Sequence, residues 1–404
     1  MKHHSYRSMQ DRYSIDRRDF FKIGGVAGAG LLLGNPLAWA QNQQKNVPPA
    51  KPKTNIEDVL KIPRTPYSLP GIFPGKVVEI KNDKAMAHDK PVAEVVEAMV
   101  GEGIGKLTGK NLKESFGLFF SKDDVVGIKV NPVGAGLIST RLEVVDAIIK
   151  WLTDCGLERR NIVIWDRFDY MLKDAGFTAD RYPGIAIEGL QTMDEEAAEG
   201  QRQDNSRWLN KDGKHVSAGN FDMDVYYWAD VVGSQDNAYL NQHVFNGKHS
   251  YFGKLVTQRL TKIINVPVFK NTGNGVSMAS KNLGYGAICN TNRLHRPLFF
   301  DVCTEVLAFP ALRDKLVLNI TDGLRAQYDG GPMPAAQFTY IFNTLFFATD
   351  AFASDMICHN LMVQKRKSMN VNVNEHPIYS EYLRYAQRLG LGITDVAKIE
   401  VCKG

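Results

Sequence analysis

Residues 124–166, DVVGIKVNPVGAGLISTRLEVVDAIIKWLTDCGLERRNIVIWD, decide the fold of this chain. The β-branched run from Asp124 to Val130 predicts a strand, and the run from Asn161 to Trp165 predicts a second one. Between them, five apolar residues recur at helical spacing, namely Val144, Val145, Ile148, Ile149 and Leu152. Gly156 is expected to end this helix. A helix between two strands is typical of a parallel pair.

The same alternation of strand and helix patterns continues outward. Further strands are predicted at Lys76–Ile80, Lys262–Phe269, Lys315–Ile320, Leu345–Ala348 and Lys398–Cys402. Further helices are predicted at Pro91–Val100, Val276–Ala287, Phe300–Leu307, Phe352–Lys365 and Ile378–Leu389. Thr140 and Glu143 predict a capping box for the helix of the central stretch. We therefore expect an α/β fold, a mostly parallel twisted sheet with helices on both faces.

Composition divides the chain into parts. Residues 41–74 are polar and rich in proline, which predicts an extended arm or linker. The α/β domain is expected to span 75–404. Residues from about 195 to 250 are polar with scattered aromatic side chains, so we interpret them as an insertion or a cap over the sheet.

The first forty residues resemble an export leader. The pair Arg17-Arg18 precedes an apolar run from Ile23 to Leu33, and Ala38-Trp39-Ala40 supplies the small residues that a signal peptidase recognises. This order predicts a twin-arginine signal cleaved after Ala40, the twin-arginine export machinery as a partner and a periplasmic or extracellular location. An uncleaved membrane anchor is the alternative. No stable membrane insertion is expected after cleavage.

Charge and cysteine content exclude several function classes. The chain carries a net charge of +5, and the leader contributes six Lys/Arg and three Asp/Glu to it. The remaining balance gives no reason to expect nucleic acid as a partner. The five cysteines form no Cys-x-x-Cys pair, so the chain has no iron–sulfur or haem motif. Buried thiols and one long-range disulfide both remain open for these cysteines.

Polar residues directly follow five predicted strands. They are Asn131, Asp166 with Arg167, Lys270 with Asn271, Asp322, and Asp350. Ligands bind beyond the carboxyl ends of the strands in an open parallel sheet, so we expect these side chains to converge on one site. The alternative for each residue is that it caps the next helix or starts a turn.

Several segments are familiar in their order and content. They are VGIKVN at 126–131, NIVIWD at 161–166, VPVFK at 266–270, SKNL at 280–283 and NITDG at 319–323. Together they resemble the domain-of-unknown-function family 362, over about Lys76 to Leu361. The family has no settled common activity, and some members carry iron–sulfur modules that this chain lacks. The resemblance implies Lys270, Lys281, Asn282, Asp322 and Asp350 as site residues.

One motif departs from the family pattern. The family often has Lys-x-His where this chain has Lys270-Asn271-Thr272, so a role for that histidine does not carry over. Lys129, Lys270 and Lys281 are predicted to bind a carboxylate or phosphate, with Lys270 or Lys281 as a base or imine-forming amine. Salt bridges to nearby aspartates are the alternative.

Two further groups complete the candidate site. Arg293, His295 and Arg296 are suited to gripping an acidic substrate, and His295 can transfer protons near neutral pH. Four aspartates make a divalent cation possible, namely Asp322, Asp329, Asp350 and Asp355. The sequence thus predicts an exported protein that binds a small anionic ligand or cofactor, with Lys and Asp residues available for catalysis. The alternative is a non-catalytic accessory protein that assists an exported redox enzyme.

Overall fold

A computed structural model of the chain describes residues 51–191, 218–232, 247–295, 297–373 and 378–404. The unit from Lys51 to Gly404 is compact. The predicted leader, at 1–40, and much of the predicted insertion lie outside the described residues.

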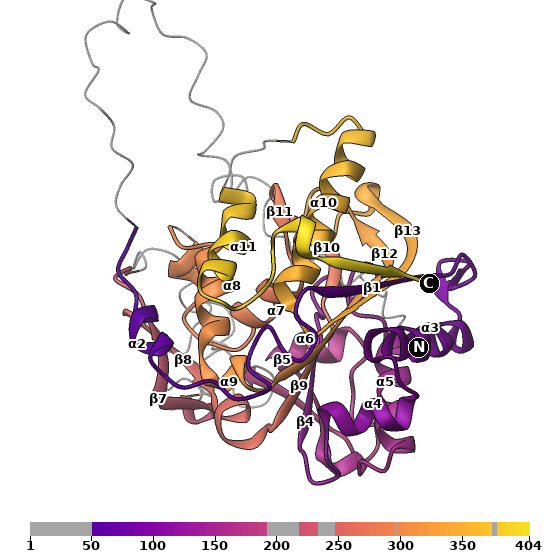
Figure 1. Ribbon diagram of the computed structural model, residues 1–404, viewed down its shortest axis with the longest axis horizontal. Coiled ribbons are helices and arrows are strands. Elements are labelled where there is room, and N and C mark those ends of the chain that lie inside the picture. The colour runs from indigo at the N-terminus through magenta and orange to yellow at the C-terminus, as the bar shows by residue number, and fades with distance from the viewer. Residues whose placement is uncertain (1–50, 192–217, 233–246, 296, 374–377) are drawn as a thin grey trace, which may run out of the picture. The chain divides into compact units, whose positions relative to one another are not determined.

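The centre of the molecule is a ten-stranded sheet (Figure 1). Its main strands run in the order β14-β1-β13-β12-β9-β4-β5-β6, and β10 pairs with β12 and β11. Each neighbouring pair on the main path is parallel except the two pairs that β13 makes. The expectation of a mostly parallel α/β sheet is therefore confirmed. The strands of this sheet are β1 (Lys76–Lys81), β4 (Val126–Lys129), β5 (Ile162–Phe168), β6 (Ala186–Gln191), β9 (Lys262–Asn265), β10 (Val268–Thr272), β11 (Gly275–Val276), β12 (Leu316–Gln327), β13 (Thr339–Ala348) and β14 (Glu400–Lys403).

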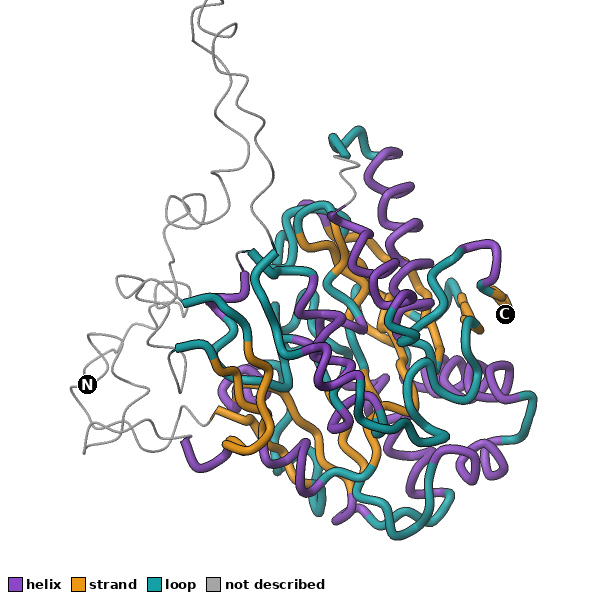
Figure 2. The backbone as a smooth tube through the Cα atoms, turned by 60° about the vertical axis from the view of Figure 1, so that its left-hand side comes forward, coloured by secondary structure: helices purple, strands orange, loops and turns teal. Residues whose placement is uncertain are grey.

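Helices lie on both faces of the sheet (Figure 2). One face is covered by α3 and α5, whose apolar residues form one core cluster with Ile128 and Ile164. The other face is covered by α7, α8 and α11, whose residues cluster with Val163 and Trp165. The described helices are α2 (Ile56–Leu60), α3 (Ala93–Thr108), α4 (Leu112–Phe119), α5 (Leu142–Asp154), α6 (Asp169–Asp174), α7 (Ala279–Gly284), α8 (Asp301–Glu305), α9 (Pro310–Arg313), α10 (Ala351–Ser368) and α11 (Ile378–Arg388).

Side chains alternate between the two faces of the sheet along β4, and this puts Lys129 on the face opposite Ile128. Ile128 packs in the cluster beneath α3 and α5. The next side chain, Lys129, contacts α7 on the opposite face, because successive strand residues point in opposite directions. The helix that follows, α5, buries the apolar stripe that its spacing predicts.

The predicted capping box of α5 is wrong. The Thr140 hydroxyl donates to the Val266 carbonyl at 2.7 Å and accepts from the Asn131 amide at 2.8 Å, so it is not available to the helix. Asp322 instead accepts the Arg141 amide at 2.7 Å, at the start of the helix. A carboxylate from another strand therefore fills the position that the local sequence suggests for Thr140.

The predicted strand Lys262–Phe269 is divided into β9 and β10. Pro267 lies at the break and has no N–H to donate to a ladder. Its carbonyl accepts the Asp322 amide at 2.8 Å, and β10 then pairs with β12. Because of this break, Lys270 belongs to β10, which continues past the end of β9 and pairs with β12.

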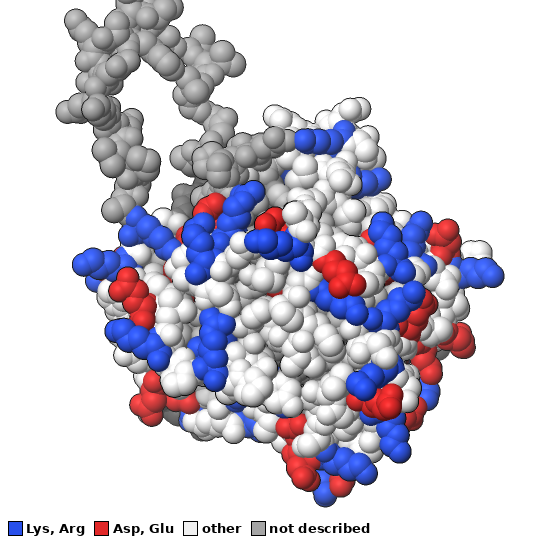
Figure 3. Space-filling model, in the orientation of Figure 1, with Lys and Arg blue, Asp and Glu red and all other residues white. Residues whose placement is uncertain are grey.

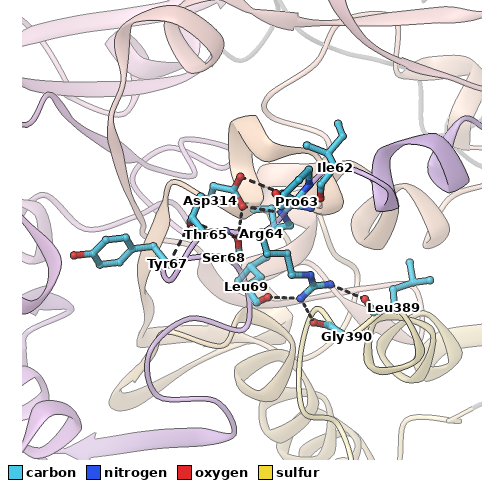
Figure 4. A network of polar contacts seen from close by, with 11 residues as sticks. Ile62, Pro63, Arg64, Thr65, Tyr67, Ser68, Leu69, Asp314, Leu389 and Gly390 are labelled. Carbon is cyan, nitrogen blue, oxygen red and sulfur yellow. Dashed lines mark hydrogen bonds and ion pairs between the residues drawn. The ribbon is translucent and has the colours of Figure 1, made fainter.

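The described part of the predicted arm, residues 51–74, packs against the body. The Arg64 guanidinium donates to the carbonyls of Leu69 at 3.0 Å, Gly390 at 2.6 Å and Leu389 at 2.9 Å (Figure 4). Leu69 itself is fully buried. The arm therefore contacts residues that lie more than 300 positions further along the chain.

Lys51, at the start of the described chain, is anchored at a buried carboxylate. Its ammonium lies 2.7 Å from both Glu305 and Asp301. Glu305 is fully buried and also accepts hydroxyl groups from Tyr227 at 2.8 Å and Tyr385 at 3.0 Å. Burial of Glu305 is compensated by these donors.

Two smaller sheets accompany the main one. The pair β2 (Met86–Ala87) and β3 (Lys90–Pro91) forms one, and β7 (Phe221–Trp228) pairs with β8 (His249–Gly253) in the other. The β7–β8 pair contains described parts of the predicted insertion. Acidic and basic side chains are interspersed on the face shown in Figure 3.

All five cysteines lie in the described chain, and all five are free thiols. Three of them are buried, namely Cys289, Cys303 and Cys358. The option of a long-range disulfide is thereby removed. Among the described residues, no helix has the length and apolar content needed to cross a membrane.

Candidate functional site

The carboxyl ends of β4 and β5 meet at a buried ion pair. Lys129, the last residue of β4, is 1% exposed and pairs with Asp166 of β5. Its ammonium also donates to the Val130 carbonyl at 2.9 Å and to Asn282 Oδ1 at 3.2 Å. An ammonium has three N–H groups, so these three acceptors use all of them.

Lys270 extends from β10 toward the loop after β4. It is fully buried, and its ammonium donates to Asn131 Oδ1 at 3.0 Å and to the carbonyls of Val133 at 3.1 Å and Ile138 at 3.4 Å. Three acceptors again match three N–H groups. Lys270 therefore fixes the β4–α5 loop and holds its positive charge in a rigid position.

Helix α7 brings the third lysine and an asparagine to this edge. Asn282 Oδ1 accepts from Asn131 Nδ2 at 3.2 Å as well as from Lys129, and its Nδ2 donates to Asn265 Oδ1 at 2.8 Å. Asn282 thus ties α7 to the loop after β4 and to the end of β9. The preceding residue of the same helix is Lys281.

The Lys281 ammonium has a different environment from the other two. Within the described chain it forms no hydrogen bond or ion pair, and the residue is only partly buried. It lies over the rings of Tyr285 at 5.1 Å and Phe299 at 5.5 Å. The ring of His295 contacts the same two rings, at 4.8 Å from Tyr285 and 5.4 Å from Phe299. Lys281 and His295 therefore share two aromatic neighbours.

Burial and like charges shift the titration of these groups. Burial lowers the pKa of Lys270 to about 7, with further lowering by Lys281 and Lys129, while Asp166 opposes the shift. Burial also lowers the pKa values of Lys129 and Lys281, and the Lys129 charge contributes to the shift of Lys281. Burial and then Lys281 lower the pKa of His295 to about 4, so this imidazole is neutral at pH 7.

The comparisons with known proteins place the chain in a family. A family model described as "Domain of unknown function (DUF362)" matches residues 126–360, more than half of the chain. The chain belongs to the DUF362 family. No curated protein matches it. A crystal structure of a Thermotoga maritima protein is 9% identical with a TM-score of 0.33, and the match covers 69% of this chain and 60% of that one. A TM-score this low supports no inference from that protein.

The DUF362 match spans both lysines of the strands and the whole of α7. It also includes His295 and the aromatic residues around Lys281. Among the elements outside it, β1 and β14 complete the sheet, and α3 and α11 contribute to its cores. The candidate site is thus formed entirely by the family region.

Asp322 lies within the DUF362 region but is not part of the lysine cluster. Its carboxylate accepts the amides of Arg141 at 2.7 Å and Leu324 at 3.0 Å. Burial raises the pKa of this carboxyl, although both amides oppose the shift. These contacts give Asp322 a role in holding the first turn of α5.

The expectation that Asp350 converges with the other strand ends is wrong. β13 runs antiparallel to β12, so its carboxyl end lies at the opposite edge of the sheet. There Asp350 caps α10 by accepting the amides of Phe352 and Ala353, and it also accepts those of Gly75 and Ile393. Burial raises its pKa to about 6.

Three other predicted site residues are placed as follows. Asn271 donates to the Gly273 carbonyl and accepts the Gly331 amide, both at 2.9 Å, and so holds two turns together. Arg293 donates to Ala229, Val231 and Lys248 carbonyls and to the Ser250 hydroxyl, which ties it to the ends of β7 and β8. Arg296 lies outside the described residues.

Arg167 adds a fourth cation near the cluster. It is 6% exposed and donates to Gln191 Oε1 at 2.9 Å and to the Thr291 hydroxyl. Its charge contributes to the lowered pKa of His295. Arg167 thus connects β5 to the segment that carries His295.

Sequence reasoning missed several residues of this site. Tyr285 and Phe299 enclose Lys281 but give no motif, because aromatic residues beside predicted helices are ordinary core residues. The sequence suggests Asp355 only as a cation ligand, whereas it accepts the amides of Ala279 at 2.8 Å and Ser280 at 2.9 Å and so caps α7 from α10. The order of Asp355 and α7 in the chain offers no signal for this contact.

The described part of the chain contains no group of three His, Cys, Asp or Glu side chains placed to hold a metal ion. The four aspartates considered for a cation are separated by their backbone and arginine contacts. A cavity of about 940 Å³ lies away from the lysines, beside α6 and β6. Its lining mixes Asp169, Glu188, Lys254 and Arg259, so it has no single charge preference.

Proposed function

We propose that the carboxyl edge of the sheet binds a small anion, such as a carboxylate or a phosphate, in contact with Lys281. The observation that carries this proposal is the charge balance of the buried cluster. Lys129, Lys270 and Lys281 lie together, and Asp166 is the carboxylate that forms an ion pair among them in the described chain. An uncompensated positive charge in a desolvated site favours an anionic ligand.

The three lysines have separable parts in this proposal. Lys129 and Lys270 donate all their N–H groups to protein acceptors, so they supply positive potential without being able to contact a ligand. Lys281 has N–H groups that no described acceptor uses. It is therefore the residue expected to donate directly to the anion.

Lys281 is a better candidate than Lys270 for the catalytic amine. A general base or nucleophile needs a lone pair that a ligand can reach. Burial lowers the pKa of Lys270 to about 7, but its amine is fully buried and held by three protein acceptors. The amine of Lys281 has no such acceptor among the described residues and shares two aromatic neighbours with the neutral His295. We propose an enzyme in which Lys281 is the reactive amine and Lys129 and Lys270 stabilise negative charge.

Isothermal titration with inorganic phosphate, oxalate and pyruvate tests the binding proposal. Binding should be at least tenfold weaker in Lys281→Met, which removes the charge and keeps a similar volume; this corresponds to about 1.4 kcal/mol. Lys110→Met, at an exposed lysine, is the matched control and should bind as the wild type does. Equal binding by both variants, or binding by none of the proteins, would reject the proposal.

A non-catalytic accessory role is the second candidate. It is favoured by Thr272, which stands where the family often has histidine and pairs with Gly275 across the β10–β11 turn. An accessory protein should bind the anion without converting it. Mass analysis of a bound ligand before and after long incubation separates the two roles.

We also propose that the protein is exported by the twin-arginine pathway and acts in the periplasm or outside the cell. The support is the order of Arg17-Arg18, the apolar run and Ala38-Trp39-Ala40. Sequencing of the mature N-terminus should begin at Gln41. Arg17→Lys with Arg18→Lys should retain the protein in the cytoplasm, and an unchanged location would contradict the proposal.

A further inference from the structure

The surroundings of Lys281 combine features that suit an amine nucleophile. The amine is partly accessible, contacts no described acceptor and lies over two aromatic rings. The charged and titratable groups that influence it are Lys129, Lys270, Cys303 and His295. Lys129 and Lys270 are held in place by protein acceptors, so neither ammonium can reach a ligand at Lys281.

The neighbouring imidazole is arranged to accept a proton. Nδ1 of His295 lies 3.1 Å from the Thr291 carbonyl oxygen, which can only accept a hydrogen bond. Nδ1 therefore carries the hydrogen of the neutral ring, and Nε2 holds the lone pair. Both His295 and Lys281 contact the rings of Tyr285 and Phe299, and the Lys281 charge lowers the pKa of His295, so the imidazole and the amine lie in one neighbourhood.

We infer that Lys281 forms an imine with a small 2-oxo acid. This inference rests on the proposed anion site and specifies its ligand. The carbonyl carbon of such an acid is the electrophile that an amine requires, and the adjacent carboxylate is the anion that the positive potential of Lys129 and Lys270 favours. A simple carboxylate lacks the electrophilic carbonyl carbon, and a neutral ketone lacks the negative charge.

The proposed step is balanced without any further reactant. The Lys281 amine attacks the carbonyl carbon, forming a C–N bond, and Nε2 of His295 takes the proton that the nitrogen releases. The C=O π bond breaks to leave an alkoxide, which takes that proton from His295 and becomes the carbinolamine hydroxyl. The second proton of the nitrogen passes to this hydroxyl by the same route, and the hydroxyl leaves as water as the C=N bond forms. One 2-oxo acid and one amine thus give one imine and one water. Burial, and the charge of Lys129, lower the pKa of Lys281 and so favour the reactive neutral amine, whereas Cys303 opposes this shift.

Borohydride trapping tests the inference on the full chain. The protein is incubated with pyruvate, reduced with sodium borohydride and digested for peptide mass spectrometry. Reduction converts the imine to a stable secondary amine. We expect the modified fraction at Lys281 to exceed that at the exposed Lys110 by at least tenfold. Acetone, which has a methyl group in place of the carboxylate, should label Lys281 much less.

Two variants define the control set. Lys281→Arg keeps a positive charge but lacks the nucleophilic amine, so its trapping should be lost while circular dichroism remains that of the wild type. Lys110→Arg should trap as the wild type does. Equal labelling of Lys281 and Lys110 in the wild-type protein would overturn the inference whether or not either variant folds.

The remaining outcomes separate this inference from the anion site. Phosphate or oxalate binding that depends on Lys281, without a pyruvate adduct, would overturn imine formation and leave the anion site standing. Equal labelling by acetone and pyruvate would overturn the assignment to 2-oxo acids. Absence of both anion binding and an adduct would overturn both proposals.

Discussion

The carboxylate of Asp355 accepts the backbone amide of Ser280 at 2.9 Å and its hydroxyl at 2.5 Å. Asp355 belongs to α10, whereas Ser280 belongs to the first turn of α7, directly before Lys281. The position of the proposed reactive amine is therefore set by a side chain 74 residues further along the chain.

Replacement of Asp355 by Ala should weaken both stability and anion binding. It leaves the amides of Ala279 and Ser280 without their acceptor, which costs about 1–3 kcal/mol for a buried group. Denaturant unfolding measures the first effect and isothermal titration with phosphate the second. Asp355→Glu should restore part of the binding if position is what matters. Anion affinity equal to that of the wild type would show that α7 keeps its place without Asp355.

Replacement of Arg64 by Met should lower stability without changing anion binding. It removes three hydrogen bonds to the carbonyls of Leu69, Leu389 and Gly390. Arg64 is exposed and water can replace its bonds, so the expected loss is about 1 kcal/mol. The arm is remote from Lys281 in these contacts, so this variant also controls for a general loss of stability in Asp355→Ala. A fall in phosphate affinity as large as that of Asp355→Ala would mean that binding reports stability alone.

Replacement of Lys281 by Met should raise the pKa of His295. In the wild type, burial and the Lys281 charge lower that pKa to about 4, and removal of the charge removes the second cause. Titration of the imidazole by NMR measures the change. Lys281→Arg keeps the positive charge and should leave the His295 titration near that of the wild type. Identical titration in both variants would place the two side chains too far apart to share a proton.

Replacement of Asp350 by Asn should change how stability depends on pH. Burial raises the pKa of Asp350 from 3.8 to about 6, so the folded protein holds this proton more tightly than the unfolded chain does. The resulting stabilisation is present below about pH 4 and is lost as pH rises to about 6; it amounts to roughly 3 kcal/mol.

Between pH 4 and pH 6 the wild type should therefore lose free energy of unfolding that Asp350→Asn does not lose. The difference between the two proteins should shift in favour of Asp350→Asn. Urea unfolding at several pH values gives both curves. Asp123→Asn, at an exposed aspartate, should run parallel to the wild type. A parallel curve for Asp350→Asn would show that its four amide contacts, rather than burial, decide the titration.

The sequence predicts the fold and part of the site. Asn131, Asp166 and Lys270 are predicted from their position at the ends of strands, because that position depends on the alternation of strands and helices along the chain, and the structure places them near one another. The same rule fails for Asp350. The residues of β13 look like those of any buried strand, and only pairing with β1 and β12 sets its direction.

Contacts made across the fold are the part that local patterns do not reveal. The capping of α5 by Asp322 displaces the local candidate Thr140, and the capping of α7 by Asp355 has no local candidate at all. The rings around Lys281 are likewise ordinary apolar residues until the chain folds. Sequence reasoning therefore proposed the cations, while the structure shows that Lys281 is the lysine of the three that has no acceptor among the described residues.

The anchoring of Lys51 at Glu305 has a consequence for the timing of maturation. The anchor needs Tyr227 of β7, Glu305 of α8 and Tyr385 of α11, so it exists only after the chain has folded nearly to its C-terminal end. Protection of the Lys51 bond from trypsin would report a completed molecule, which is the state that the twin-arginine machinery transports.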